Sequence, residues 1–374
     1  MRLNGRKNEG YLMKNVLKVI GACLLIALFA VLTVIGYLTV DEFKPEDVED
    51  IEIMGSAGDR IEVGRENTLM SWNIGYGALG DNADFFMDGG KKVYTADRAR
   101  VQENLSSIAA EIGKVNPDIL VMQEVDRNSS RSYLNDELRI IADEAGASVT
   151  SHQSAFAPNF VVSFVPVPIP PIGKVNAGLV AMSSYEISSA KRYSLPCPFS
   201  WPLRTFNLKR CLQILRTPVS GSDKEMVLIN LHLEAYDEGD GKIAQTNMLR
   251  DIMQAEADAG NYVIVAGDFN QTFSTTDISG YPIVEGLWQA GVIETADFGS
   301  EFSFHTDNSV PTCRSLDRAL TTTEDTSPQN FQYYVIDGCI VSSNVKISDI
   351  KTIDLGFKSS DHNPVVIKFT LIGE

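Results

Sequence analysis

The sequence predicts a single α/β domain that follows one transmembrane helix, and three observations support this prediction. An uncharged run extends from Val19 to Val40 near the N-terminus. After residue 66, short apolar segments typical of buried strands alternate with segments of helical periodicity. No internal repeat, low-complexity block or linker-like break divides this part of the chain. Although the length permits two domains, the steady alternation favours one large α/β domain.

The first 40 residues have the composition of a membrane anchor. Five Lys and Arg side chains precede the uncharged run, which at 1.5 Å per residue spans about 33 Å, enough to cross a bilayer core of roughly 30 Å. The run is longer than the roughly 7–15 residues of a signal-peptide core, and no small-x-small cleavage site follows it. We therefore predict a cytoplasmic N-terminus at 1–18, a signal anchor at 19–40 and an extracytoplasmic remainder. A cleaved secretion signal is the alternative.

Beyond residue 40 the chain is strongly acidic. Of the 32 Lys and Arg and the 49 Asp and Glu, 27 and 48 respectively lie after residue 40, which gives this part a net charge of −21. Such a field repels polyanions unless a basic patch or bound cations offset it. We find one small candidate patch, formed by Arg204, Lys209 and Arg210. The charge therefore favours retention of a divalent metal over broad nucleic-acid binding.

Residues 41–66 are predicted to form a polar stalk or an irregular lead-in, and residues 67–374 the main domain. Four cysteines lie outside the membrane run: Cys197, Cys211, Cys313 and Cys339. In an oxidising compartment they allow three connectivities, whereas free buried thiols are the alternative. No CxxC or Cys/His spacing is present, so a zinc site is not expected.

Two strand ends in the first part of the domain carry polar side chains. The segment Leu69–Ile74 is predicted as a strand, and Asn73 at its end is a neutral oxygen ligand or a hydrogen-bond donor to phosphate. The buried strand Ile119–Met122 is followed by Glu124. A carboxylate in that place is costly unless it meets a cation or an Arg, so Glu124 is a candidate metal ligand. A surface carboxylate is the alternative.

The connections between these strands are predicted from periodicity and from proline. Apolar stripes predict one helix that starts at Thr95 and stops at Gly113, and a second helix over 242–259. The segment from Phe156 to Lys174 is rich in proline, which argues against a helix and against a central strand. We predict a loop packed over the core there, with an exposed apolar loop that touches lipid as the alternative.

The segment Tyr262–Val265 reads as a buried strand that leads through Gly267 to Asp268 and Asn270. Residues i and i+2 of an extended chain point the same way, so an acid and an amide are expected to face one spot. A carboxylate beside a carboxamide suits the deprotonation and orientation of one attacking water. An Asx-rich turn after a strand is the alternative.

Two of the four histidines occur in comparable positions. His232 ends a buried strand, at the same end as Glu124 and Asp268 if the strands run parallel; a lone His there is usually structural. Asp337 interrupts an apolar strand near the C-terminus and needs a partner. The adjacent pair Asp361 and His362, on a turn before the last strand, supplies one.

Together these segments resemble the endonuclease/exonuclease/phosphatase superfamily, which includes pancreatic-type deoxyribonucleases, neutral sphingomyelinases and inositol-polyphosphate phosphatases. The matching segments come in the family's order: Trp72-Asn73-Ile74, Gln123-Glu124-Val125, Asn230-Leu231-His232-Leu233, Gly267-Asp268-Phe269-Asn270, Ile336-Asp337 and Ser360-Asp361-His362-Asn363-Pro364-Val365. The resemblance covers residues 67 to about 370. It implies a four-layer α/β sandwich, with two β-sheets packed face to face and helices outside.

The resemblance also implies roles for the candidate residues. Glu124, assisted by Asn73 and Asp361, would hold Mg²⁺ or Mn²⁺, because these ions prefer oxygen ligands. Asp268 would activate the water, with Asn270 orienting the water or the phosphate.

Three further residues complete the set that the resemblance implies. His232 and His362 would donate to the phosphoryl oxygens, and Asp337 would orient His362.

We therefore expect a membrane-anchored, divalent-metal-dependent phosphoester hydrolase, either a phosphodiesterase or a monoesterase, that acts outside the cytoplasm. The expected substrate is a lipid headgroup, a small phosphoester or a nucleic acid, and no obligate protein partner is evident. An extracellular nuclease is the first alternative, and a non-catalytic binding protein on the same fold is the second. The acidity and the proline-rich segment favour a lipid or a small phosphoester.

Overall fold

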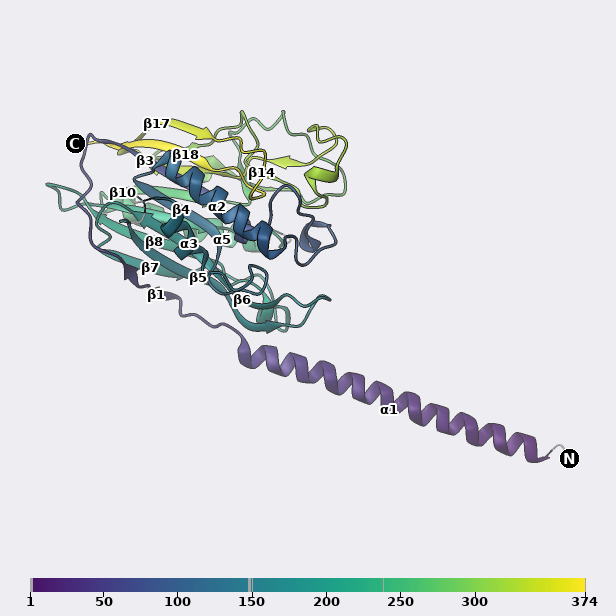
Figure 1. Cartoon of the computed structure of the whole chain (residues 1–374). Coiled ribbons are helices and arrows are strands. Elements are labelled where there is room, and N and C mark those ends of the chain that lie inside the picture. The colour runs from purple at the N-terminus through teal and green to yellow at the C-terminus, as the bar shows by residue number, and fades with distance from the viewer. Residues whose placement is uncertain (1–2, 147–148, 150, 238, 374) are drawn as a thin grey trace.

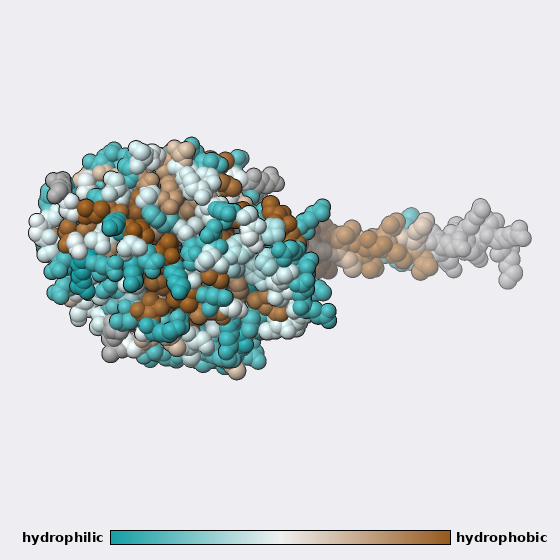
Figure 2. Space-filling view, turned by 90° about the horizontal axis from the view of Figure 1, so that it is seen from above, coloured by the Kyte–Doolittle hydropathy of each residue, from teal (hydrophilic) through white to brown (hydrophobic). Residues whose placement is uncertain are grey.

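The computed structural model describes residues 3–146, 149, 151–237 and 239–373. Helix α1 (Leu3–Asp41) projects from a domain built by the rest of the chain (Figure 1). Among the described residues, Tyr11–Asp41 is the one helical segment whose length and hydropathy suit a membrane span. In the space-filling view this segment stands as an apolar rod outside the domain (Figure 2).

The domain contains two seven-stranded sheets. Sheet A has the order β1-β7-β8-β9-β10-β16-β13, and its β9–β10 pair is parallel. Its strands are β1 (Val48–Asp50), β7 (Ser189–Ser194), β8 (Cys211–Pro218), β9 (Glu225–His232), β10 (Tyr262–Asp268), β16 (Asp337–Ser342) and β13 (Phe302–His305). Sheet B has the order β17-β18-β3-β4-β6-β5-β2, and its β3–β4 pair is parallel. Its strands are β17 (Val345–Thr352), β18 (Val365–Leu371), β3 (Glu66–Asn73), β4 (Ile119–Asp126), β6 (Gly173–Ser183), β5 (Gln153–Val165) and β2 (Ile53–Met54).

Three helices cover the outer faces of the sheets. Helices α2 (Arg98–Val115) and α3 (Glu137–Glu144) pack on sheet B, and α5 (Asp240–Asp258) packs on sheet A. A third apolar cluster is formed by side chains from strands of both sheets, and the two sheets lie one above the other in Figure 1. The predicted four-layer α/β sandwich, preceded by an apolar helix, is confirmed.

Short elements complete the chain. The two-stranded sheets pair β11 (Gln271–Phe273) with β12 (Gly291–Ile293) and β14 (Cys313–Arg314) with β15 (Tyr333–Tyr334). The 3₁₀ turns are η1 (Gly75–Gly77), η2 (Phe86–Asp88), η3 (Leu203–Phe206), η4 (Thr295–Phe298) and η5 (Leu320–Thr322). All five cysteines lie in the described part of the chain and are free thiols.

The bounds of α2 differ from the prediction at both ends. The helix begins after Asp97, whose side chain accepts a hydrogen bond from Arg100 N at 2.8 Å and so caps the first turn. It continues through Gly113 and ends at Asn116, which adopts the left-handed conformation. A Cβ at Gly113 would lie 2.4 Å from Ala145 O, so this glycine permits close packing beside α3 and does not end the helix.

The proline-rich segment is a β-hairpin and not a loop. Strand β5 runs through Pro158, where the register with β6 shifts between Pro158 and Phe160. On the other side of β5, the pairing with β2 covers Ser154 and Ala155 alone. Pro158 therefore lies at a bulge beyond the reach of β2, where a missing N–H is tolerated. The prolines after residue 165 are confined to the hairpin tip.

The segment 41–66, predicted as a stalk or lead-in, adds a short strand to each sheet. Strand β1 pairs with β7 at the edge of sheet A, and β2 pairs with β5 at the edge of sheet B. Residues 48–54 thus belong to the sandwich, and the end of α1 is held close to it. The domain boundary at residue 67 stays a prediction.

Gly267 provides a test of how tightly the two central strands are packed. Its φ is +148°, and a Cβ there would lie 2.2 Å from Leu231 O on the neighbouring strand β9. We expect Gly267→Ala to lower the free energy of unfolding by at least about 2 kcal/mol, because backbone strain and overpacking add. Thermal and urea unfolding of the full chain measure this loss. Gly280→Ala is the control, since nothing lies within 4 Å of a Cβ there; equal stability of the two variants would contradict the packing argument.

Candidate active site

The strand pairing brings polar strand ends together in one pocket. In sheet A the register sets His232 beside Asp268 and Asp268 beside Asp337. In sheet B the end of β3, with Asn73, lies beside the end of β4. The carboxyl ends of parallel strands form one edge of a sheet, where α/β proteins place their ligands. The pocket is lined by seven of the predicted residues: Asn73, Glu124, His232, Asp268, Asn270, Asp361 and His362.

Asp268 is the residue at which the two sheets meet in this pocket. Its side chain is 1% exposed. Its Oδ2 accepts a hydrogen bond from Asn73 Nδ2 at 3.0 Å, and the same oxygen lies 3.4 Å from His232 Nε2 and 3.7 Å from His362 Nε2. One carboxylate thus contacts residues that lie far apart in the sequence.

Asn270 lines the same pocket as Asp268, but strand alternation does not place it there. The expectation of one shared direction for Asp268 and Asn270 assumed an extended chain, whereas Asn270 has a φ of +51°. The backbone N–H of Asn270 donates to Asp268 Oδ1 at 2.9 Å, and its side-chain Nδ2 donates to Leu233 O at 2.9 Å. Asn270 therefore holds Asp268 through its backbone, and its amide ties the strand end to the segment after β9.

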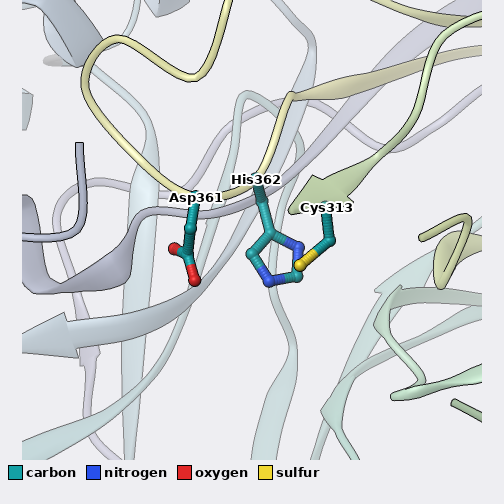
Figure 3. Close-up of side chains that lie close together, drawn as sticks. All are labelled: Cys313, Asp361 and His362. Atoms are coloured by element: carbon teal, nitrogen blue, oxygen red, sulfur yellow. The ribbon is translucent and has the colours of Figure 1, made fainter. Parts of the chain in front are cut away.

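His362 is held by Asp337. The two residues are joined by a 2.8 Å hydrogen bond between His362 Nδ1 and Asp337 Oδ2, which leaves Nε2 directed at Asp268. Asp361 and His362 project side by side from one turn, and the Cys313 thiol lies next to the imidazole (Figure 3). Burial raises the pKa of Cys313 to about 12, so this thiol is neutral at physiological pH.

Burial shifts the ionisation of the central residues. It raises the pKa of Asp268 to about 6, and the nearby His362 opposes this rise. For His232, burial and then the positive charges of Arg210 and His362 lower the pKa well below its usual range. Burial also disfavours a charged His362, but its neighbours Cys313, Asp337 and Asp268 together raise the pKa of His362 well above its usual range. The pKa values of the two histidines are thus shifted in opposite directions.

Glu124 has the features of a residue that holds a cation. It sits at a bulge in β4, between the paired residues Met122 and Val125, with a φ of +54°. Its Oε2 is buried, and no described residue donates a hydrogen bond to it. Burial raises the pKa of Glu124, and Arg131 opposes this rise. A buried, unpartnered carboxylate oxygen fits a divalent metal ion.

Asp361 and Asn73 supply further oxygen atoms next to Glu124. Burial raises the pKa of Asp361 to about 6; His362 opposes this rise, and the charge of Glu124 adds to it. Both carboxylates line the same pocket. Both ends of the Asn73 side-chain amide form hydrogen bonds. Its Oδ1 accepts from Gly75 N at 3.1 Å, and its Nδ2 donates to Asp268. The donor set of Glu124, Asp361 and Asn73 is all oxygen, which is the set that Mg²⁺ and Mn²⁺ prefer.

The opposite wall of the pocket was missed from the sequence. Tyr236 donates a hydrogen bond from its hydroxyl to Asp88 Oδ1 at 2.8 Å, and Trp288 lies on the same wall, bonded to Ala235 O. Burial raises the pKa of Asp88 to about 6, although the bond from Tyr236 opposes the rise. Asp88, Tyr236 and Trp288 come from three separate loops. None of them follows an apolar run of the kind that identified the other candidate residues.

Two arginines of the pocket are also fixed by acids. Arg131 pairs with Asp126 at 3.0 Å and stacks over the ring of Tyr76, and Arg210 pairs with the buried Glu234 at 3.4 Å. A buried Asp126 directly after β4 is the sequence signal that points to a partner such as Arg131.

The small basic patch predicted at Arg204, Lys209 and Arg210 is only partly neutralised. Arg204 and Lys209 share the carboxylate of Glu42, at 3.3 Å each, while Arg210 is buried with its own acid. Two cations thus face one acid at Glu42, so the patch keeps a small positive charge.

A family model decides the classification. The model described as the endonuclease/exonuclease/phosphatase family matches residues 70–362. The chain belongs to this family. Its members are phosphoester hydrolases that typically use a divalent metal, so the expectation of a metal-dependent phosphoester hydrolase is confirmed at that level. No curated protein matches the chain.

Solved structures show the same fold at low sequence identity. An endonuclease/exonuclease/phosphatase protein from Beutenbergia cavernae is 20% identical, with a TM-score of 0.55 over 83% of this chain and 72% of that one. The human Nocturnin catalytic domain with bound sulfate is 15% identical, with a TM-score of 0.50 over 86% and 97%. ANGEL2, a 2',3'-cyclic phosphatase, is 13% identical, with a TM-score of 0.50 over 87% and 99%.

Metal binding at Glu124 is testable without an activity assay. If Glu124 Oε2 holds the ion, Mg²⁺ at ten times its dissociation constant stabilises the folded chain by about 1.4 kcal/mol. We expect thermal unfolding of the full chain to shift upward with Mg²⁺ or Mn²⁺ and to return in EDTA. Glu124→Gln is expected to move this response to much higher metal concentration.

The matched control is Glu103→Gln, an exposed position on α2. It is expected to respond to metal as the wild-type chain does. A Glu124→Gln variant with an unchanged metal titration would show that the ligand assignment is wrong.

Proposed function

We propose that this protein hydrolyses a phosphoester by direct attack of a water that Asp268 deprotonates. The observation that carries this proposal is the position of Asp268, which contacts Asn73, His232 and His362 inside one buried pocket. A raised pKa makes Asp268 a stronger base than an exposed carboxylate while it stays ionised at neutral pH. The attacking oxygen bonds to phosphorus, its proton passes to Asp268, and the phosphorus–oxygen bond to the leaving alcohol breaks.

The two histidines supply hydrogen-bond donors from opposite sides of Asp268. Asp337 is hydrogen-bonded to His362 Nδ1 and helps to raise the pKa of His362, so we assign His362 Nε2 as a donor to a phosphoryl oxygen. Burial lowers the pKa of His232, whose neutral form still donates through one ring nitrogen. Negative charge builds on the phosphoryl oxygens in the transition state, so these donors stabilise it more than they stabilise the bound substrate.

Glu124, Asp361 and Asn73 are the residues that would hold the divalent ion. A bound Mg²⁺ or Mn²⁺ supplies polarisation of the phosphoryl oxygen and of the leaving group. The unpartnered oxygen of Glu124 and the facing carboxylate of Asp361 support this assignment.

We place the reaction on the outer side of a membrane. The proposal rests on α1, whose segment Tyr11–Asp41 suits a span, and on the Lys and Arg residues that precede it, which favour a cytoplasmic N-terminus. In this topology residues 1–18 are cytoplasmic, 19–40 cross the bilayer, and the catalytic domain is extracytoplasmic.

The nuclease and scaffold alternatives have less support. A net charge of −21 after residue 40 opposes binding of a polyanion, and the candidate basic patch is small and partly paired with acids. A scaffold protein has no need of an intact set of buried acids and histidines around one carboxylate, since each buried charge costs stability.

The roles of Asp268 and His362 are testable by kinetics. We expect Asp268→Asn and His362→Ala each to lower kcat by about 10²–10⁴-fold, because general acid–base and donor groups contribute on that scale. The measurement is hydrolysis of bis(p-nitrophenyl) phosphate by the full chain with Mg²⁺ or Mn²⁺. Circular dichroism of each variant checks that the fold is intact.

Asp349→Asn and His305→Ala are the matched controls, since both residues lie outside the pocket lining. Rates close to wild type are expected for both. A folded wild-type chain without turnover on any phosphoester would favour the scaffold alternative.

A further inference from the structure

Two neighbouring segments expose large apolar side chains beside the end of α1. The β5–β6 hairpin tip exposes Phe164, Val167 and Ile169, the last of which is 92% exposed. The segment 199–206, which contains η3, exposes Trp201 and Leu203. We call these five residues the apolar rim. Exposed apolar residues gathered in this way mark an interaction surface, whereas scattered single ones do not.

Both segments of the apolar rim contact the last turn of α1. Ser163, next to Phe164, donates from its backbone N to Asp41 at 2.7 Å and from its hydroxyl at 2.6 Å. Trp201 donates from Nε1 to Thr39 Oγ1 at 3.0 Å. The apolar rim therefore lies where α1 leaves the domain, and Figure 1 shows α1 leaving on the side of β6.

Glu42 fixes this junction further. Its side chain is buried, and it pairs with Lys44, Arg204 and Lys209. The hydrogen bonds of Asp41 and the ion pairs of Glu42 hold α1 to the domain through side chains as well as through the chain itself. The orientation of the domain relative to α1 is thus set by structure and not by a flexible stalk.

The pocket opens next to the same junction. Phe160 and Ile172, at the two sides of the hairpin, line the pocket. Phe160 is three residues before Ser163 on strand β5, a separation of about 10 Å at 3.3 Å per residue. Leu208 also lines the pocket and precedes Lys209, the partner of Glu42. The pocket wall and the end of α1 are therefore parts of one structural unit.

We propose that the apolar rim docks on the outer leaflet of the bilayer that α1 crosses, and that the pocket takes the phosphoester of a membrane lipid from that leaflet. The substrate half of this proposal rests on the proposed function. Aromatic and aliphatic side chains beside a membrane span gain by burial at the headgroup–acyl boundary. The hairpin then carries the pocket wall at Phe160 to the depth at which lipid phosphates lie.

The charges at this surface indicate which bilayer it fits. Arg204 and Lys209 are occupied by Glu42, and the chain after residue 40 is acidic. Two cations share one carboxylate, so these residues keep a weak attraction to anionic lipids, which the acidic remainder of the chain opposes, and the apolar contacts carry the docking. We expect docking on a phosphatidylcholine bilayer without any need for an anionic lipid.

Trp201 reports docking directly. The chain has three tryptophans, of which Trp72 is buried and Trp288 is bonded inside the domain. The full chain is placed in nanodiscs with phosphatidylcholine that is brominated near the top of its acyl chains. We expect quenching of one component of the tryptophan fluorescence, and we expect this component to be missing in Trp201→Phe. Equal quenching in wild type and Trp201→Phe would overturn the docking.

The second experiment compares hydrolysis of membrane lipids with hydrolysis of a soluble phosphodiester. The double variant Val167→Ser with Ile169→Ser is expected to hydrolyse nanodisc lipids at least about tenfold more slowly, since each buried methylene contributes about 0.8 kcal/mol. Its rate on bis(p-nitrophenyl) phosphate is expected to stay at the wild-type level. Ile372→Ser is the matched control, because Ile372 is 44% exposed and follows β18 at the opposite end of sheet B.

The lipid assay uses a nanodisc mixture of phosphatidylcholine, sphingomyelin and a phosphoinositide, with plasmid DNA as a separate substrate. Products that retain the lipid backbone support the proposal. Turnover of the soluble ester or of plasmid DNA with every lipid intact would overturn the lipid substrate while the proposed hydrolase stands. Absence of turnover on all substrates would instead reject the proposed function, and the Trp201 quenching would still decide the docking.

Discussion

The site depends on four carboxylates gathered at one junction between the two sheets. Asp268, Asp337 and Asp361 are buried, and the side chain of Glu124 is 25% exposed with one buried oxygen. Mutual repulsion and loss of hydration make such a cluster costly unless cations lie among the acids. A protonated His362 would offset Asp337 and Asp268. The proposed divalent ion would offset the charge of Glu124, whose Oε2 accepts no hydrogen bond from the described residues.

The sandwich holds these acids in place through amides between its sheets. Asn230 on β9 donates to Val180 O on β6 and to Gln213 on β8, and Gln123 on β4 donates to Asn230 Oδ1 at 2.8 Å. This network lies behind Asp268 and links sheet A to sheet B. Because the buried amides of this network bind groups on both sheets, they limit the alternative arrangements and help to set the spacing between Glu124 on one sheet and Asp268 on the other.

The residues at strand ends were predictable from the sequence, and those on loops were not. Glu124, His232 and Asp268 follow apolar runs whose parallel pairing brings their ends together. The Asp88–Tyr236 wall depends on loop paths that no periodicity encodes. Asn270 reaches the same pocket as Asp268 through a left-handed residue and not through the alternation of an extended strand that the prediction assumed. The strand through Pro158 was not predicted from the sequence. A proline is tolerated in this strand because the neighbouring strand β2 ends before it, and where β2 ends depends on the tertiary structure.

The central claim is that a water activated by Asp268 attacks phosphorus directly. It is tested by turnover of a phosphoester in water labelled with ¹⁸O, followed by mass spectrometry of both products. The account predicts one ¹⁸O atom in the phosphoryl product, none in the leaving alcohol, and formation of the labelled product about 10²–10⁴-fold more slowly in Asp268→Asn. Label in the alcohol, or an unchanged rate of labelled product in Asp268→Asn, would contradict it.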